Sequence, residues 1–428
     1  MDRTPSVRTA IACALLAALP LQATAHGGMH NDAGQPGTTF KKLPEATTLE
    51  QALALCVSDK DMTPDKLLSG LGGTRYDLVA LGDSEKIQAF YSQGMALQYG
   101  FNFSEAIRAF YQAYRLDTGS AMPLWGIALS ASSNINTDAT DGCDQLAFLA
   151  ANLARNNARK RVDKVPSGFT DAQVKREAGY AKAFLSQYDV DGDDITLSMD
   201  GKKRYVNEMK SLSDTWFDDL DASTLYADAL LNIAPWKWWK GSEATSDDVQ
   251  PTDEAAKALE VLNRVLVQDS NHSGANHFYI HAIEESPFPD SGMPMAERFR
   301  TLNPAVGHLI HMASHIYQRT GNNALSSATN YAAISVDRAY ANQARPESPY
   351  LLHYLGHNIH FLTWTLSIEG RKNEALNMAS ELVDNTTANA SVEFLCEKYP
   401  AELKTKSDYF YACLLYTSDA ADEEDSED

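Results

Sequence analysis

Several features that other proteins depend on are scarce in this chain. It has only five cysteines in 428 residues, too few for a disulfide framework to hold the fold. After residue 25 no stretch approaches the roughly 20 apolar residues of a membrane-spanning helix. Acidic residues outnumber basic ones by 57 to 36, and no basic stripe offsets them. Nucleic acid and anionic membrane surfaces are therefore unsuitable partners.

Familiar catalytic motifs are also missing. The sequence has no glycine loop that would cradle a phosphate, no dinucleotide-binding fingerprint and no GxSxG nucleophile elbow. Strand-like alternation of apolar and polar residues is nearly absent, and proline is scarce inside the periodic segments. These absences argue against nucleotide-dependent enzymes and α/β-hydrolases, and they favour an all-α fold.

The two ends of the chain are predicted to lie outside the fold. Arg3 and Arg8 precede a short apolar run, and Ala23-Thr24-Ala25 fits a cleavage site, so residues 1–25 are predicted to be a signal peptide. The mature protein would begin near His26 and be periplasmic or secreted. Residues 26–48 are predicted to be a flexible arm. Residues 413–428 resemble the translation of a transposase adapter used in DNA library preparation, and a disordered tail is expected there.

Three cysteines remain when Cys13 and Cys413 are set aside: Cys56, Cys143 and Cys396. An exported location permits a disulfide. The preferred pair is Cys56 with Cys143.

Residues 49–412 are predicted to form a stack of helix pairs, an α-solenoid of tetratricopeptide type with irregular insertions. Between Ala89 and Thr118, small and large residues alternate at the spacing of that helix–turn–helix repeat. Small residues let two helices approach closely, and an aromatic side chain fills the gap beside them. The residues at these positions are Gly94, Leu97, Ala106, Phe110 and Ala113. A second pair is expected from Ala121, and the polar stretch Tyr188 to Asp200 is read as an insertion.

Nine of the eleven histidines lie between His272 and His360. Their spacing repeats the period of a helix, so each stripe returns to one face. His272 is expected in the turn before the first of these helices. The three predicted stripes are His277, His281 and Glu284; His308, His311 and His315; and His353, His357 and His360.

The eight histidines and one glutamate of the three stripes are predicted to be metal ligands within the region 272–360. Imidazole nitrogen suits copper, zinc, iron and nickel. The number of groups exceeds the three or four ligands of one tetrahedral site, which favours two or more ions. Copper is the preferred ion, because nitrogen-rich ligation and an extracytoplasmic location favour it over iron, with zinc and iron as the alternatives. The alternative interpretation is a buried polar network that orders the helices.

Two residues near the stripes are candidate catalytic groups. Glu284 could act as a general base on metal-bound water, and Tyr317 could supply a hydrogen bond or redox chemistry. Trp236, Trp238 and Trp239 form an aromatic patch that could stack a saccharide or aromatic substrate, although a core anchor is the simpler reading.

Several of these segments resemble a family of large bacterial exported tetratricopeptide-repeat proteins with histidine-rich helices. They are Leu124–Leu129, Leu225–Leu230, His277–Glu284 and Gly307–Tyr317. The resemblance covers about residues 89–383. The resemblance implies the fold, but it implies no established activity.

Three functions follow as expectations. The first is a multinuclear copper or iron oxidoreductase acting on a small molecule. The second is a zinc-dependent hydrolase. The third is a non-catalytic scaffold that binds a protein through its repeat surface, or a metal store or chaperone.

Overall fold

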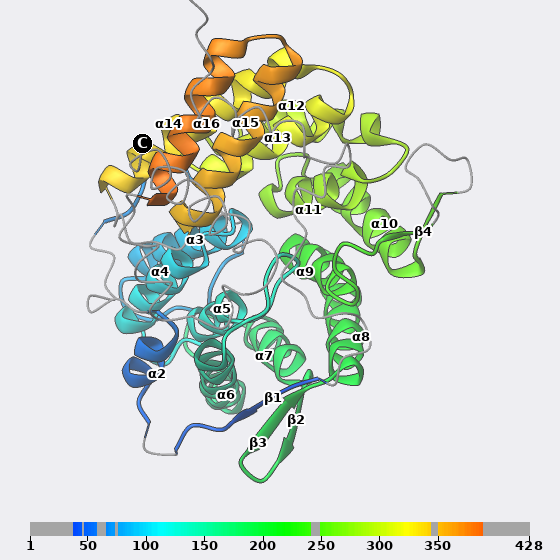
Figure 1. The fold of residues 1–428 in the computed structure, drawn as a ribbon. Helices are drawn as coiled ribbons and strands as arrows, with labels where there is room; N and C mark the ends of the chain where they lie inside the picture. Colours follow the sequence, from blue (N-terminus) through cyan, green and yellow to red (C-terminus); the bar gives the residue numbers. More distant parts are fainter. Residues whose placement is uncertain are drawn as a thin grey trace, which may run out of the picture. The chain divides into compact units, whose positions relative to one another are not determined.

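The computed structural model describes residues 37–44, 47–57, 66–72, 76–240, 249–343 and 350–387. Helices make up most of these residues (Figure 1), which confirms the predicted all-α fold. The predicted signal peptide and tail lie outside the described residues, as does Cys396. Among the helices that the structure describes, none is both long and apolar enough to cross a membrane.

The described residues divide into two compact units, whereas the sequence suggested one domain over 49–412. The first unit ends at Phe288 and the second begins at Pro289. Pro287 and Pro289 flank the boundary. Because proline lacks an amide hydrogen and clashes with the preceding turn, the helix that ends at Glu284 cannot continue through them.

The first unit contains helices joined by short links and two small sheets. Its elements are β1 (Thr38–Lys41), α2 (Leu49–Cys56), α3 (Ser84–Tyr99), α4 (Phe103–Leu116), α5 (Met122–Ala131), α6 (Asp141–Asp163), α7 (Asp171–Leu185), β2 (Tyr188–Asp191), β3 (Asp194–Leu197), α8 (Met199–Thr215), α9 (Leu220–Leu231), β4 (Trp239–Lys240), β5 (Gln250–Pro251), α10 (Asp253–Gln268) and α11 (Ser273–Glu284).

The second unit is helical throughout its described part. It contains a 3-10 turn (Pro289–Gly292), α12 (Met293–Phe299), α13 (Gly307–Arg319), α14 (Asn323–Gln343), a π-helical turn (Leu351–Leu355), α15 (Gly356–Ile368) and α16 (Lys372–Thr387). Helices α13, α14 and α15 pack side by side, as do α15 and α16 (Figure 1).

Polar residues fix where many helices of the first unit begin. Each accepts a hydrogen bond from an amide of the first helical turn, which would otherwise lack a partner. These N-caps are Thr48, Asp83, Thr140, Thr170, Ser198, Asp219, Thr252 and His272. His272 thus lies before its helix, as the sequence predicted.

The packing of α3, α4 and α5 follows the predicted use of small residues. Phe110 on α4 is fully buried. A Cβ atom added to Gly94 on α3 would lie 2.5 Å from its ring, and one added to Gly126 on α5 would lie 2.6 Å away. The ring therefore occupies space that only glycine leaves free on both neighbouring helices. This local packing agrees with a helix-pair repeat, while the full solenoid arrangement remains an expectation.

Part of the predicted flexible arm is ordered in the structure. Thr38–Lys41 forms β1, which pairs antiparallel with β3, and β3 pairs with β2. The backbone hydrogen bonds to β3 and the burial of Phe40 hold this segment. The predicted insertion Tyr188 to Asp200 contains the β2–β3 hairpin, whose turn uses Gly192 at a φ of +60°.

The predicted disulfide between Cys56 and Cys143 is confirmed. It joins α2 to α6 and closes a loop with a sequence separation of 87 residues. Because a cross-link across so long a loop restricts the unfolded chain, it stabilises the folded state.

We predict that the double variant Cys56→Ser/Cys143→Ser unfolds with a free energy lower by about 2–4 kcal/mol. Denaturant unfolding without reductant measures the difference. Cys396→Ser is the control and should match the parent protein. Equal stability of the double variant would contradict the structural role given to this disulfide.

Candidate metal centre

Three histidines of the second unit meet in its interior. His311 and His315 are one turn apart on α13, and His357 comes from α15. Each has a ligand nitrogen, and these nitrogens lie within 4.8 Å of one another. The three residues are 0%, 2% and 7% exposed. These residues, called the histidine triad below, could hold one metal ion.

The protonation of His311 can be read from its neighbours. The Asn330 side chain donates from Nδ2 to the carbonyl oxygen of Ser326 at 2.9 Å. Its Oδ1 therefore faces Nδ1 of His311, at 2.6 Å. Because a carbonyl oxygen only accepts, His311 Nδ1 donates, and its Nε2 keeps a lone pair directed at the triad. An outer partner of this kind is what orients a metal-binding imidazole.

His315 contacts His311 directly. Their Nε2 atoms are 2.8 Å apart, so His315 Nε2 donates to the His311 lone pair. Two nitrogens bound to one tetrahedral ion at 2.0–2.1 Å would lie about 3.3 Å apart. Metal binding would thus require a separation of the rings by about half an ångström and a shift of the His315 proton to Nδ1.

Burial keeps both rings neutral at physiological pH. It lowers the pKa of His311 well below the usual value of 6.5, with the neighbouring His315 adding to the effect. Burial alone lowers the pKa of His315 to about 3. Since only neutral imidazole binds a metal, the two rings are in the required form before an ion arrives.

We predict a pH-dependent contribution of His315 to stability. The pKa of His315 is about 3 in the folded protein and 6.5 for the free group. Between these two values the unfolded state binds a proton that the folded state does not bind. The free energy of unfolding therefore falls by roughly 1.4 kcal/mol per pH unit below 6.5. His315→Gln should remove this term.

The stability difference between the parent protein and His315→Gln should accordingly shrink by roughly 2 kcal/mol from pH 7 to pH 5. Urea unfolding of both metal-free proteins at each pH gives the difference directly. A difference that stays constant with pH would contradict a buried, neutral His315.

The other two histidines of the third predicted stripe are not part of the triad. His353 and His360 are only half-buried, and burial lowers the pKa of each. The π-helical turn Leu351–Leu355 contains His353. The ring centroid of His353 lies 5.0 Å from that of Tyr354.

His308 lies in the first turn of α13, the helix that carries His311 and His315. Its ring lies 4.5 Å from the ring of Tyr354 and 6.0 Å from that of His311, measured between centroids. Its backbone amide donates to the hydroxyl of Tyr350 at 3.1 Å. Within the second unit, His308 thus neighbours the triad without being one of its three ligands.

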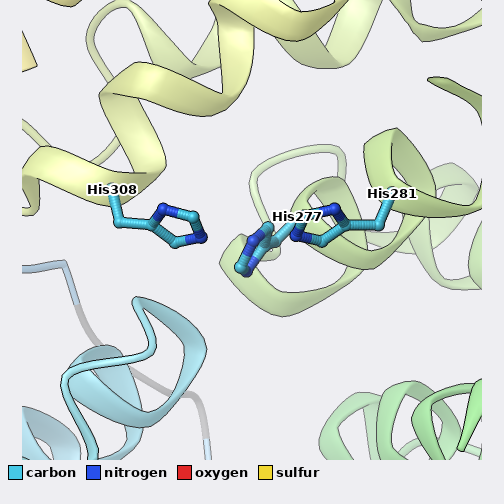
Figure 2. Close-up of side chains that lie close together, drawn as sticks. All are labelled: His277, His281 and His308. Carbon is cyan, nitrogen blue, oxygen red and sulfur yellow. The ribbon is translucent and has the colours of Figure 1, made fainter. Parts of the chain in front are cut away.

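The first unit carries two further candidate ligands, His277 and His281 on α11. Both are fully buried, and their ring centroids are 4.6 Å apart (Figure 2). His277 Nδ1 donates to the carbonyl oxygen of Tyr99 at 2.6 Å. His281 Nδ1 lies 2.8 Å from Oε1 of Glu284. In both rings Nε2 is therefore the remaining ligand nitrogen.

Glu284 orients His281 in this structure. A carboxylate that accepts from a ring Nδ1 fixes the ring and makes Nε2 a stronger donor to a metal. Glu284 was predicted from the sequence as a ligand and as a general base, and the structure places its Oε1 atom beside His281.

Two aromatic residues with unusual backbones surround the pair in the first unit. Phe101 and Trp236 have φ values of 58° and 59°, and they are the only non-glycine residues with positive φ in the described part of the chain. The Phe101 ring lies 4.4 Å from that of His277, and the Trp236 ring 5.4 Å from that of His281. Such strained positions concentrate at functional sites.

The tryptophan patch is held by backbone carbonyls. The indole nitrogens of Trp236, Trp238 and Trp239 donate to Ile135, Leu231 and Ala282 respectively, at 2.7–2.9 Å. Trp238 is 1% exposed. This agrees with the reading of the patch as a core anchor.

The hydroxyl of Tyr317 has its partner on α12. The hydroxyl donates to Glu297 on α12 at 2.6 Å. Burial, followed by this carboxylate, raises the pKa of Tyr317. The predicted catalytic tyrosine is thus tied to an exposed carboxylate in this structure.

Two polar residues beside the triad were not singled out from the sequence. Asn330 holds His311, and the hydroxyl of Ser314 lies 3.3 Å from His311 Nδ1. A signal was present on α14, where Ser326, Asn330 and Asp337 recur at helical spacing on one buried face. Phe361 packs against the triad, with its ring centroid 4.8 Å from that of His315.

Comparisons with known proteins add no family to this geometry: no protein-family model matches the chain, and no curated protein is significantly similar to it.

Proposed function

We propose that this protein binds a transition-metal ion through His311, His315 and His357, and that it is a copper-dependent oxidoreductase. The observation that carries the metal site is the triad itself. Its three buried imidazoles come from two helices and have ligand nitrogens within 4.8 Å of one another. Three helix-borne imidazoles per ion are a ligand set suited to copper.

The composition of the site favours copper over the alternatives. The group of potential ligands around His311 consists of imidazoles alone. Iron sites that react with dioxygen commonly include carboxylate. A zinc hydrolase needs a general base beside the ion, and the group of potential ligands that contains His311 includes no carboxylate among the described residues.

A second ion is proposed for the first unit, which makes the protein multinuclear. His277 and His281 present two oriented nitrogens, held by a carbonyl and a carboxylate. The neighbouring Phe101 and Trp236 keep the pair in an apolar setting. Glu284 is proposed to position His281 in this site.

Copper, when bound, supplies one-electron redox chemistry. A small-molecule substrate would lose two electrons and two protons, and dioxygen would accept them to give hydrogen peroxide. The residues of the chain would hold the ion and exclude water from it, as the burial of the triad and of Phe361 suggests. Export to the periplasm or the medium, and a tetratricopeptide-like stack, remain part of this proposal.

Copper loading followed by electron paramagnetic resonance tests the choice of metal and chemistry. We expect a cupric signal with nitrogen hyperfine splitting that disappears on reduction and returns in air. Zinc at full stoichiometry with copper excluded would favour the hydrolase. A signal that air cannot restore would favour a metal store.

A further inference from the structure

The first unit also contains a pocket that has no connection with the histidines. Its volume is about 540 Å³, within the range of small-molecule sites. The aromatic side of the pocket is formed by residues from β1, β2 and α6. The rings of Phe40 and Phe148 pack edge-on against Tyr188, at 6.1 Å and 5.3 Å between centroids. Leu149 and Leu185 extend the apolar wall.

Two cations lie among the residues that line the pocket. They are Lys42, which follows β1, and Arg155 on α6. Among the described residues that line it, none is a carboxylate. This is notable in a chain with a net charge of −21. Such a local excess of positive charge favours an anion.

Two hydrogen bonds through the Asn152 side chain position Arg155 on α6. The Asn152 side chain donates from Nδ2 to the carbonyl oxygen of Phe148 at 2.8 Å. Its Oδ1 then accepts from the Arg155 guanidinium, also at 2.8 Å. Phe148, Asn152 and Arg155 all line the pocket. The guanidinium is thus positioned beside the apolar wall before a ligand binds, which lowers the entropic cost of binding.

From these contacts we infer that the pocket binds a small organic anion with an apolar body, such as an aliphatic or aromatic carboxylate or sulfonate. The aromatic wall would bury the body of the ligand. Arg155 and Lys42 would receive its charged group from α6 and from the end of β1. This site is independent of the metal proposal, because none of its lining residues is a candidate ligand.

A matched pair of fluorescent probes tests this inference. 8-Anilinonaphthalene-1-sulfonate carries the anion, and N-phenyl-1-naphthylamine has the same aromatic body without it. The full-length protein should bind the sulfonate at least about tenfold more tightly, since one well-placed charged hydrogen bond contributes about 1.5–3 kcal/mol. Lys42→Gln/Arg155→Gln should remove this preference. Arg159→Gln/Lys160→Gln, on exposed positions of the same helix, should retain it.

A second variant separates this pocket from binding elsewhere. Leu149→Trp should fill the pocket and weaken both probes, while circular dichroism and thermal unfolding establish that the variant is folded. Equal affinity for the two probes, or a sulfonate preference that persists in Lys42→Gln/Arg155→Gln, would overturn the inference.

Discussion

His315→Ala is expected to abolish metal binding by the second unit. The residue supplies one of three ligand nitrogens and lies 2.8 Å from His311. Loss of an outer partner alone typically weakens metal binding by roughly 10–100-fold, so loss of a ligand should exceed about 100-fold. Competition with a chromophoric copper chelator would measure the change. The bound copper should fall by one ion per chain at concentrations that saturate the parent protein.

The chain offers matched controls for this experiment. His353→Ala and His360→Ala remove histidines from the same region that lie outside the triad, and both should leave the affinity nearly unchanged. Asn330→Ala should give an intermediate loss of roughly 10–100-fold, because it frees His311 to rotate. If His353→Ala weakens binding as much as His315→Ala does, the triad is not the site.

Phe110→Ala is expected to have the largest effect on stability, a loss of about 3–5 kcal/mol. The ring is fully buried and fills the gap between α3 and α5. Gly94 and Gly126 have no side chains that could relax into the cavity. The cost should therefore lie toward the upper end of the range for a buried phenylalanine.

Gly94→Ala tests the same contact from the opposite side. Its Cβ would lie 2.5 Å from the Phe110 ring, so overpacking should cost about 1–3 kcal/mol. Combining Gly94→Ala with Phe110→Leu should recover part of that loss, because the smaller side chain makes room for the methyl group. Guanidinium unfolding of the four proteins provides the comparison. Strict additivity of the two substitutions would show that they do not share this space.

The sequence predicted the parts of the fold that depend on local periodicity. Gly94 and Phe110 were identified because a close helix pair requires a small residue opposite a large one. The disulfide was predicted because an exported location permits one, and Cys56 with Cys143 was the preferred pair. The β1 strand was not predicted, since Thr38–Lys41 is ordered only by pairing with β3 more than 150 positions later. The division at Pro289 depends on how helices group in space, which one-dimensional patterns do not contain.

The sequence predicted the type of ligand at the candidate site, imidazole, but only some of the residues that come together there. The spacing of His311 and His315 placed both on one helical face, and the structure brings them together with His357. The spacing of His353 was equally regular, but His353 lies in the π-helical turn and is not among the three residues of the triad. Glu284 was predicted to be a metal ligand and a general base. Its role depends on the 2.8 Å contact with His281 Nδ1, which no sequence pattern specifies.

Anomalous X-ray diffraction at the copper edge, from crystals of copper-loaded protein, tests the metal proposal most directly. The account predicts an anomalous peak at bonding distance, about 2.0–2.1 Å, from nitrogens of His311, His315 and His357, with the two Nε2 atoms of α13 moved apart to about 3.3 Å. Copper-saturated crystals with no copper at these three residues, and with the 2.8 Å hydrogen bond between His311 and His315 intact, would contradict it.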